Sequence, residues 1–325
     1  MSWRKISPDQ WFDAILQNDM STVTKYLTRM KKTVDKRKLS AGTQIIPGFC
    51  GIHYAAMYGM FEMFRLLLDN EFMCLTKMTT HIESSKTAYK FSLPGNSTFV
   101  HILCCTTNNK SRQLLSYFIE QLQNKENEFK YQKLIGVQNS LGLNATHVSL
   151  LTGKLGPLIP STATLSQLPQ HSSIQQRVTE ITKTLDENQI WWANPLVLQR
   201  ELYQKTEDEL TTVMIACLFG RSEFIAMICY LFTLDPFQLH GIDVSKMTEQ
   251  NKKQVEKQLD ETVKNLRWQR KILGNLIMEK EKEGYTAQHA LDDKLEIWEY
   301  GGERMPREYC RQFLNEIEKI IKKNM

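Results

Sequence analysis

Apolar residues recur at helical spacing along most of this chain, and polar or glycine-containing breaks separate the helices that they predict. In the stretch 47–70, Gly59 divides the apolar positions into two short helical runs. A similar pair is predicted over 11–27, with Asn18 and Asp19 as the break between its helices. The pattern therefore predicts consecutive helix–turn–helix units.

The clearest unit, 47–70, combines a glycine-containing turn, a short helix with a histidine and an alanine pair, a glycine break, and a second helix ending in leucines. This combination resembles one ankyrin repeat. Cys50 and Gly51 stand where the family has Thr-Pro. The residues in register with the family pattern are Gly48, Ile52, His53, Ala55, Ala56, Gly59, Glu62, Leu67 and Leu68.

Later segments repeat the turn and the first helix of this unit, and Met214 stands where one of them should carry a histidine. In ankyrin repeats the threonine and the histidine of each turn bind neighbouring backbone groups. The resemblance therefore implies a structural role, rather than metal binding or catalysis, for the turn residues of this chain. They are His53, Thr98, His101, His147, Thr211, Thr286 and His289.

The turns lie farther apart than the family period of ~33 residues, so long insertions are expected. We expect an all-α, ankyrin-like helical repeat solenoid with inserted helices. N-terminal repeats are expected over 1–153, an insertion or degenerate helix pair over 154–205, and C-terminal repeats over 206–325. A long inserted helix is predicted at 246–283, either as an amphipathic helix packed on the array or as a short coiled-coil seam.

Two segments interrupt the helical pattern. The polar stretch 77–94 is expected to form an extended loop or a degenerate hairpin. Pro160 falls where the second helix of the unit beginning near 141 should continue, and a proline inside a helix costs about 3 kcal/mol. A loop is therefore predicted over 154–173.

Composition narrows the class of protein without identifying it. The chain has 325 residues, of which 42% are hydrophobic and 24% charged, as in ordinary folded soluble proteins. Its net charge of +5 is too small to require a nucleic acid partner. Seven cysteines without a C-x-x-C pair, no secretory leader and no apolar run of ~18 residues predict an intracellular, reduced protein without a transmembrane segment. The cytoplasm is the expected location, with the nucleus as the alternative.

Motifs for catalysis are missing from the sequence. It contains no phosphate-binding loop, dinucleotide fingerprint, nucleophile elbow or zinc-protease helix. Successive repeats lie ~10 Å apart, so two turn histidines are too distant to share a zinc ion, whose nitrogen ligands lie at about 2.1 Å. We therefore expect a non-catalytic protein without metal or cofactor.

The predicted function is that of a scaffold or adaptor, acting as a monomer that binds another protein. Binding is expected on the concave face and the projecting turns, where methionine and aromatic side chains offer contact area at low entropy cost. The same side chains can instead pack beneath the long insertions. The candidate binding residues are Met57, Tyr58, Leu151, Thr152, Leu218 and Phe219.

Two other functions remain open. An effector-type modifying activity would lie in the insertion 154–205, around His171, Glu180 or Asp186. An adaptor for nucleic acid or an anionic membrane would instead use a basic surface. Its candidate residues are the lysines and arginine of 31–38 together with Arg267, Arg270 and Lys271.

Overall fold

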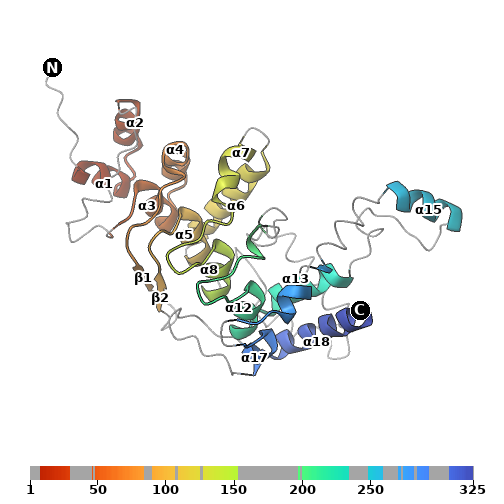
Figure 1. Cartoon of the computed structure of the whole chain (residues 1–325). Coiled ribbons are helices and arrows are strands. Elements are labelled where there is room, and N and C mark those ends of the chain that lie inside the picture. The colour runs from red at the N-terminus through yellow and green to blue at the C-terminus, as the bar shows by residue number, and fades with distance from the viewer. Residues whose placement is uncertain are drawn as a thin grey trace, which may run out of the picture. The chain divides into compact units, whose positions relative to one another are not determined.

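A computed structural model describes residues 8–29, 46, 48–83, 90–106, 109–124, 127–152, 197, 200–233, 248–258, 270–271, 274–281, 284–292 and 307–324. The chain forms two compact units. Unit 1 comprises Met1–Ile159, Asn188–Asp208 and Ile297–Glu303, and unit 2 comprises Pro160–Glu187, Glu209–Glu296 and Arg304–Met325. The described residues are mostly helical, which confirms the all-α class (Figure 1).

The described part of unit 1 is a succession of short helices with a pair of strands between two of them. Its elements are α1 (Pro8–Leu16), α2 (Met20–Arg29), α3 (Gly51–Tyr58), α4 (Phe61–Glu71), β1 (Thr80–Glu83), β2 (Lys90–Leu93), α5 (Phe99–Cys105), α6 (Asn109–Gln123), α7 (Glu128–Tyr131), the 3-10 turn η2 (Gln132–Leu134) and α8 (Ala145–Thr152).

These helices pack in two rows. α1, α3, α5 and α8 contact one another in that order, and α2, α4 and α6 form a second row alongside (Figure 1). The interior between the rows is aromatic. The Phe99 ring lies 5.1 Å from that of Phe64 and 4.9 Å from that of Phe118, both edge-on. Three helices, α4, α5 and α6, thus meet at one ring, an arrangement that aromatic pairs favour.

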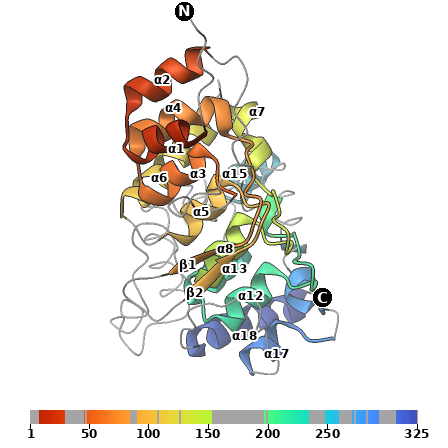
Figure 2. The ribbon, with the colours of Figure 1, turned by 90° about the vertical axis from the view of Figure 1, so that its left-hand side faces the viewer.

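The segment predicted as a loop or a hairpin is a hairpin. β1 and β2 pair antiparallel with Thr80 opposite Leu93, and Figures 1 and 2 draw the two strands side by side. Its base is closed between α4 and α5: Thr76 N–H donates to Ser97 O (2.8 Å) and Asn96 N–H donates to Thr76 O (2.7 Å). The chain therefore leaves the helical rows at Thr76 and returns to the same place.

Unit 2 contains α12 (Thr212–Leu218), α13 (Ser222–Thr233), α15 (Glu249–Gln258), α17 (Ala287–Leu291) and α18 (Glu308–Asn324). α12 packs against α17, and α13 packs against α18. Two arginines hold the end of α17. Arg307 Nη1 donates to Ala290 O (2.9 Å), and Arg311 Nη2 donates to Leu291 O (3.1 Å). Cations at a helix C-terminus satisfy its last carbonyls and its dipole.

Several predicted segments lie partly or wholly outside the described residues. Of the insertion 154–205, the structure describes 197 and 200–205. Of the inserted helix 246–283, it describes 248–258, 270–271 and 274–281, with α15 inside the first of these ranges. The sites suggested for a modifying activity, His171, Glu180 and Asp186, lie outside the described residues.

Candidate functional site

Histidines cap the first helices of the helix pairs. Nδ1 of His53, His101 and His289 accepts from the backbone N–H three residues earlier, at Cys50, Thr98 and Thr286, over 3.0, 3.1 and 3.0 Å. Because Nδ1 accepts, the proton of each neutral ring is on Nε2. In His53 that nitrogen donates to Cys74 O (3.1 Å), and in His101 it donates to Leu143 O (3.0 Å). The imidazoles of His53 and His101 therefore tie their turns to the chain that follows.

Burial removes two of the turn histidines, His101 and His147, from acid–base chemistry. It lowers the pKa of His101 to about 4 and that of His147 to about 3, because desolvation penalises the charged ring. Both rings are neutral near pH 7. Within the part of the chain that the structure describes, no three His, Cys, Asp or Glu side chains are grouped to hold a metal ion.

The turn before α12 has Met214 in place of the histidine, but it keeps the threonine of the cap. Thr211 Oγ1 accepts from Met214 N–H (3.2 Å) at the start of α12. Met214 is fully buried, so the thioether occupies core space. This turn thus keeps the threonine cap and the packing but has no imidazole to reach the following chain.

Two buried glutamates, which sequence reasoning missed, also cap first helices. Glu71, at the end of α4, accepts from Ile52 N–H in α3 (2.7 Å). Glu201 accepts from Thr146 N–H in α8 (2.9 Å), from the Thr146 hydroxyl (2.6 Å) and from Gly136 N–H (3.0 Å). Ile52 and Thr146 are each the second residue of their helix, where a backbone N–H has no partner inside the helix.

The two glutamates make equivalent contacts in two parts of the chain whose sequence spacing differs. Glu71 lies 19 residues after Ile52, whereas Glu201 lies 55 residues after Thr146. Glu201 therefore binds the start of α8 in the way that Glu71 binds the start of α3. The sequence signal that the two residues share is a glutamate three residues after a run of three apolar residues, which are 66–68 before Glu71 and 196–198 before Glu201.

Four of the six predicted binding residues are buried: Leu151, Thr152, Leu218 and Phe219. Thr152 shows why, because its hydroxyl donates to Val148 O (2.9 Å) in its own helix and lies 3.2 Å from Cys104 O of α5. The prediction that these four side chains line an accessible face is wrong. Their burial agrees with the alternative that they pack inside the protein.

The other two predicted residues, Met57 and Tyr58, lie at the surface where α3 turns into α4. Tyr58 is 45% exposed, and its ring stacks at 6.4 Å on that of Tyr54. Phe61 is 37% exposed and contacts the Tyr117 ring edge-on at 5.1 Å. The surface formed by Met57, Tyr58, Phe61, Arg65 and Tyr117 is called the α3–α4 corner.

Helix α6 fixes the shape of this corner. Gly59 ends α3 with φ +66°, and an added Cβ would lie 2.8 Å from Ser111 N, so a side chain does not fit there. The Ser111 hydroxyl donates to Ala56 O (2.7 Å) at the end of α3. The aromatic side chains of the corner are therefore carried on a closely packed junction of three helices.

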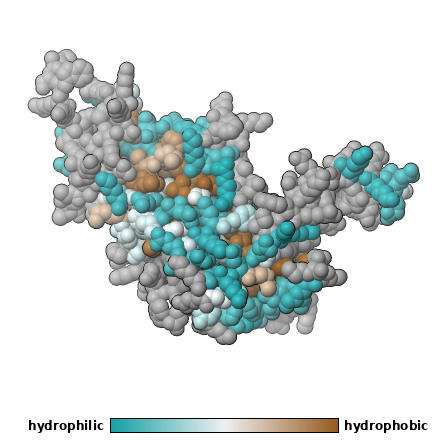
Figure 3. Space-filling model, in the orientation of Figure 1, coloured by the Kyte–Doolittle hydropathy of each residue, from teal (hydrophilic) through white to brown (hydrophobic). Residues whose placement is uncertain are grey.

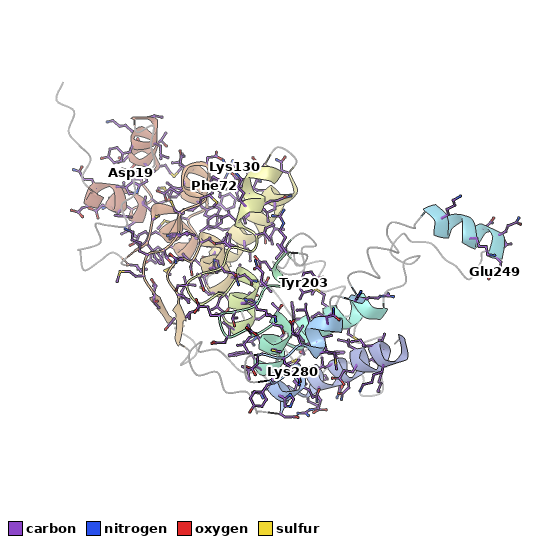
Figure 4. All side chains as sticks on the ribbon, in the orientation of Figure 1. Asp19, Phe72, Lys130, Tyr203, Glu249 and Lys280 are labelled. Atoms are coloured by element: carbon purple, nitrogen blue, oxygen red, sulfur yellow. The ribbon has the colours of Figure 1, made fainter. Side chains whose placement is uncertain are left out.

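A second surface cluster joins α4 to α7 (Figure 4). Lys130 Nζ lies 2.5 Å from Asp69 Oδ1 and 5.2 and 5.1 Å from the ring centres of Phe72 and Tyr131. The hydrogen bond from Lys130 lowers the pKa of Asp69. The space between Asp69 and the two rings is filled by the Lys130 ammonium group. These contacts therefore hold α4 and α7 together and leave no room for a ligand cation.

Figure 3 shows apolar residues gathered on unit 1 in the region where Figure 1 draws α4 and α6. The predicted basic surface is described only at Arg270 and Lys271, because 31–38 and Arg267 lie outside the described residues. None of the described helices has both the length and the apolar character needed to cross a membrane.

Comparison with known proteins does not assign the chain to a family. No protein-family model matches the chain, and no curated protein sequence matches it significantly.

Proposed function

We propose that this chain is an ankyrin-like helical repeat protein that binds another protein through the α3–α4 corner and has no catalytic activity. The repeat interpretation is supported by helix pairs whose first helices begin with the same Nδ1 cap and whose Nε2 atoms reach the following chain. Ankyrin repeats stack in this way, so that each unit is stabilised by its neighbours.

The observation that carries the binding proposal is the exposure of two aromatic rings, Tyr58 and Phe61, on a rigid junction. Aromatic side chains concentrate at the centres of protein interfaces because they bury a large area with few rotatable bonds. Stacking of Tyr58 on Tyr54 and the edge-on contact of Phe61 with Tyr117 orient the rings before a partner arrives. This reduces the entropy that binding must overcome.

The absence of catalysis is proposed on the chemistry of the buried groups. Burial lowers the pKa of the turn histidines His101 and His147, so both rings are neutral near pH 7 and inaccessible. Burial also raises the pKa of the thiols of Cys217 and Cys229 to about 12, so neither is a nucleophilic thiolate at neutral pH.

The experiment is proximity labelling in cells with the full chain and its Tyr58→Ala, Phe61→Ala double variant. The matched control is Met73→Ala, Met78→Ala, which removes two exposed apolar side chains elsewhere in unit 1. Thermal melting should show that all three proteins are equally folded. We expect a set of labelled proteins that is lost only with the Tyr58/Phe61 variant. Identical sets for all three proteins would refute binding at the corner.

A further inference from the structure

The rings of the α3–α4 corner are bordered by positive charge. The Arg65 guanidinium lies over the Tyr117 ring, 5.9 Å from its centre, and half of the arginine side chain is exposed. Lys110 is exposed and lies directly against the turn, since a Cβ added at Gly59 would come within 2.3 Å of its Cβ. Arg65 thus lies against the Tyr117 ring that Phe61 contacts, and Lys110 lies beside the turn that follows Tyr58.

One carboxylate also lies at this border. Glu62 Oε2 is 3.4 Å from Arg65 Nη1, and both side chains are more than half exposed. An exposed ion pair of this length contributes little and exchanges readily with other partners. Arg65, Lys110 and Glu62 together carry a net positive charge, and the guanidinium remains able to form hydrogen bonds with a carboxylate from outside.

The position of Arg65 favours carboxylate binding beyond simple attraction. Stacking on Tyr117 limits the rotation of the guanidinium, so less entropy is lost when it binds. A planar guanidinium offers two parallel N–H groups to one carboxylate. Lys110 adds a second positive charge. The border is thus suited to two or more carboxylates close to one apolar side chain.

We infer that the α3–α4 corner binds a partner segment in which a bulky apolar side chain is flanked by aspartate or glutamate. This inference rests on the proposed function, because it specifies the partner of the same surface. The apolar side chain packs between Tyr58 and Phe61, and the neighbouring carboxylates pair with Arg65 and Lys110. Binding of this kind weakens as salt concentration rises, because exposed charges are screened.

The test selects binders from a phage-displayed library of random 16-residue peptides on the full-length chain. We expect enriched peptides to carry aspartate or glutamate beside phenylalanine, tryptophan or leucine. Tyr58→Ala, Phe61→Ala should abolish their binding. Arg65→Glu, Lys110→Glu should weaken it at least tenfold, and exchanging the acidic residues of a peptide for lysine should restore binding to this charge-reversed variant.

The control for charge is Lys25→Glu, Lys133→Glu, which makes the same change in net charge at two other exposed lysines of unit 1. It should bind the selected peptides as the wild type does, and melting curves should match for all variants. Peptides that need the rings but carry no acidic bias, or that bind the charge-reversed variant equally well, would refute the acidic partner and leave the proposed function standing. If no peptide depends on Tyr58 and Phe61, both proposals fail.

Discussion

The first backbone N–H groups of α3 and α8 need hydrogen-bond acceptors from outside the helix, and the two helices obtain them from different residues. At α3 the residue before the helix is Cys50, and at α8 it is Asn144, whose Oδ1 accepts from His147 N–H (2.8 Å). Asparagine is among the best N-terminal caps, whereas cysteine has only a weak acceptor. Both helices then receive a distant glutamate, Glu71 or Glu201, at their second backbone N–H.

The two contacts differ in the length of chain between the glutamate and the helix start that it binds. Closing a loop of 55 residues costs about 1 kcal/mol more than closing one of 19 residues. Glu201 accepts from both the N–H and the hydroxyl of Thr146 and from Gly136 N–H, and buried hydrogen bonds of this kind contribute about 1 kcal/mol each. Local polar contacts thus offset the cost of a long insertion.

The largest expected effect follows from removing Glu201. Glu201→Ala leaves the N–H groups of Gly136 and Thr146 buried without this acceptor, and we expect a loss of about 4 kcal/mol in the free energy of unfolding. Urea titration followed by circular dichroism measures it, with exposed Glu207→Ala as the control. A loss below about 1 kcal/mol would show that Glu201 does not hold the insertion closed.

Removing Glu71 tests the same contact across the shorter loop. We expect Glu71→Ala to cost about 2 kcal/mol, because Ile52 N–H loses this acceptor while Phe64, Leu67 and Leu68 still anchor α4. Exposed Glu62→Ala is the matched control in the same helix. If Glu71→Ala proves more costly than Glu201→Ala under the same titration, the proposed relation between loop length and contacts is wrong.

Acid should destabilise the protein through its buried histidines. An unfolded histidine gains its proton near pH 6.5, whereas the folded pKa is about 3 for His147 and about 4 for His101. Between these values the unfolded state binds more protons, so stability is lost as pH falls. We expect a loss of about 1–2 kcal/mol per histidine between pH 7 and pH 5.

The check is a series of urea midpoints from pH 7.5 to pH 5 for the wild type and for His147→Gln. The glutamine variant is expected to be less stable at pH 7.5 but to lose less stability on acidification. Parallel pH curves for the two proteins would mean that His147 has no part in the acid response.

The smallest effect concerns the weaker cap of α3. Cys50→Thr should stabilise the protein by about 0.5–1 kcal/mol, because a threonine hydroxyl accepts from the start of the helix better than a thiol does. Thr98 and Thr211 already occupy buried positions of the same backbone geometry. Cys50→Ser separates the hydroxyl from the added methyl group. Destabilisation by both variants in thermal melts would contradict the interpretation that a hydroxyl at position 50 is a better cap than the thiol.

Local patterns of the sequence predicted local structure well. The break at Gly59 and the choice of loop or hairpin at 77–94 depend on residues close together in the chain, and the structure has an αL turn and a hairpin there. The all-α class followed from apolar spacing in the same way.

Burial and long-range pairing could not be predicted in this way. Apolar spacing identifies the inward side of a helix, but it does not say whether the end of that helix is also covered, and Leu151 and Leu218 are both buried. The pairing of Glu201 with Thr146 crosses an insertion, and no periodic signal links the two positions. Tyr58 was the predicted binding residue that proved most exposed.

The closed base of the β1–β2 hairpin has a practical consequence. Asn96 N–H donates to Thr76 O (2.7 Å), so α4 and α5 are linked at the base of the hairpin as well as through the loop that joins its strands. Such a junction tolerates growth, shortening or replacement of its loop. It offers a place to insert an epitope or a fluorescent protein into the intact chain, remote in sequence from Tyr58 and Phe61, so that binding could be followed in living cells.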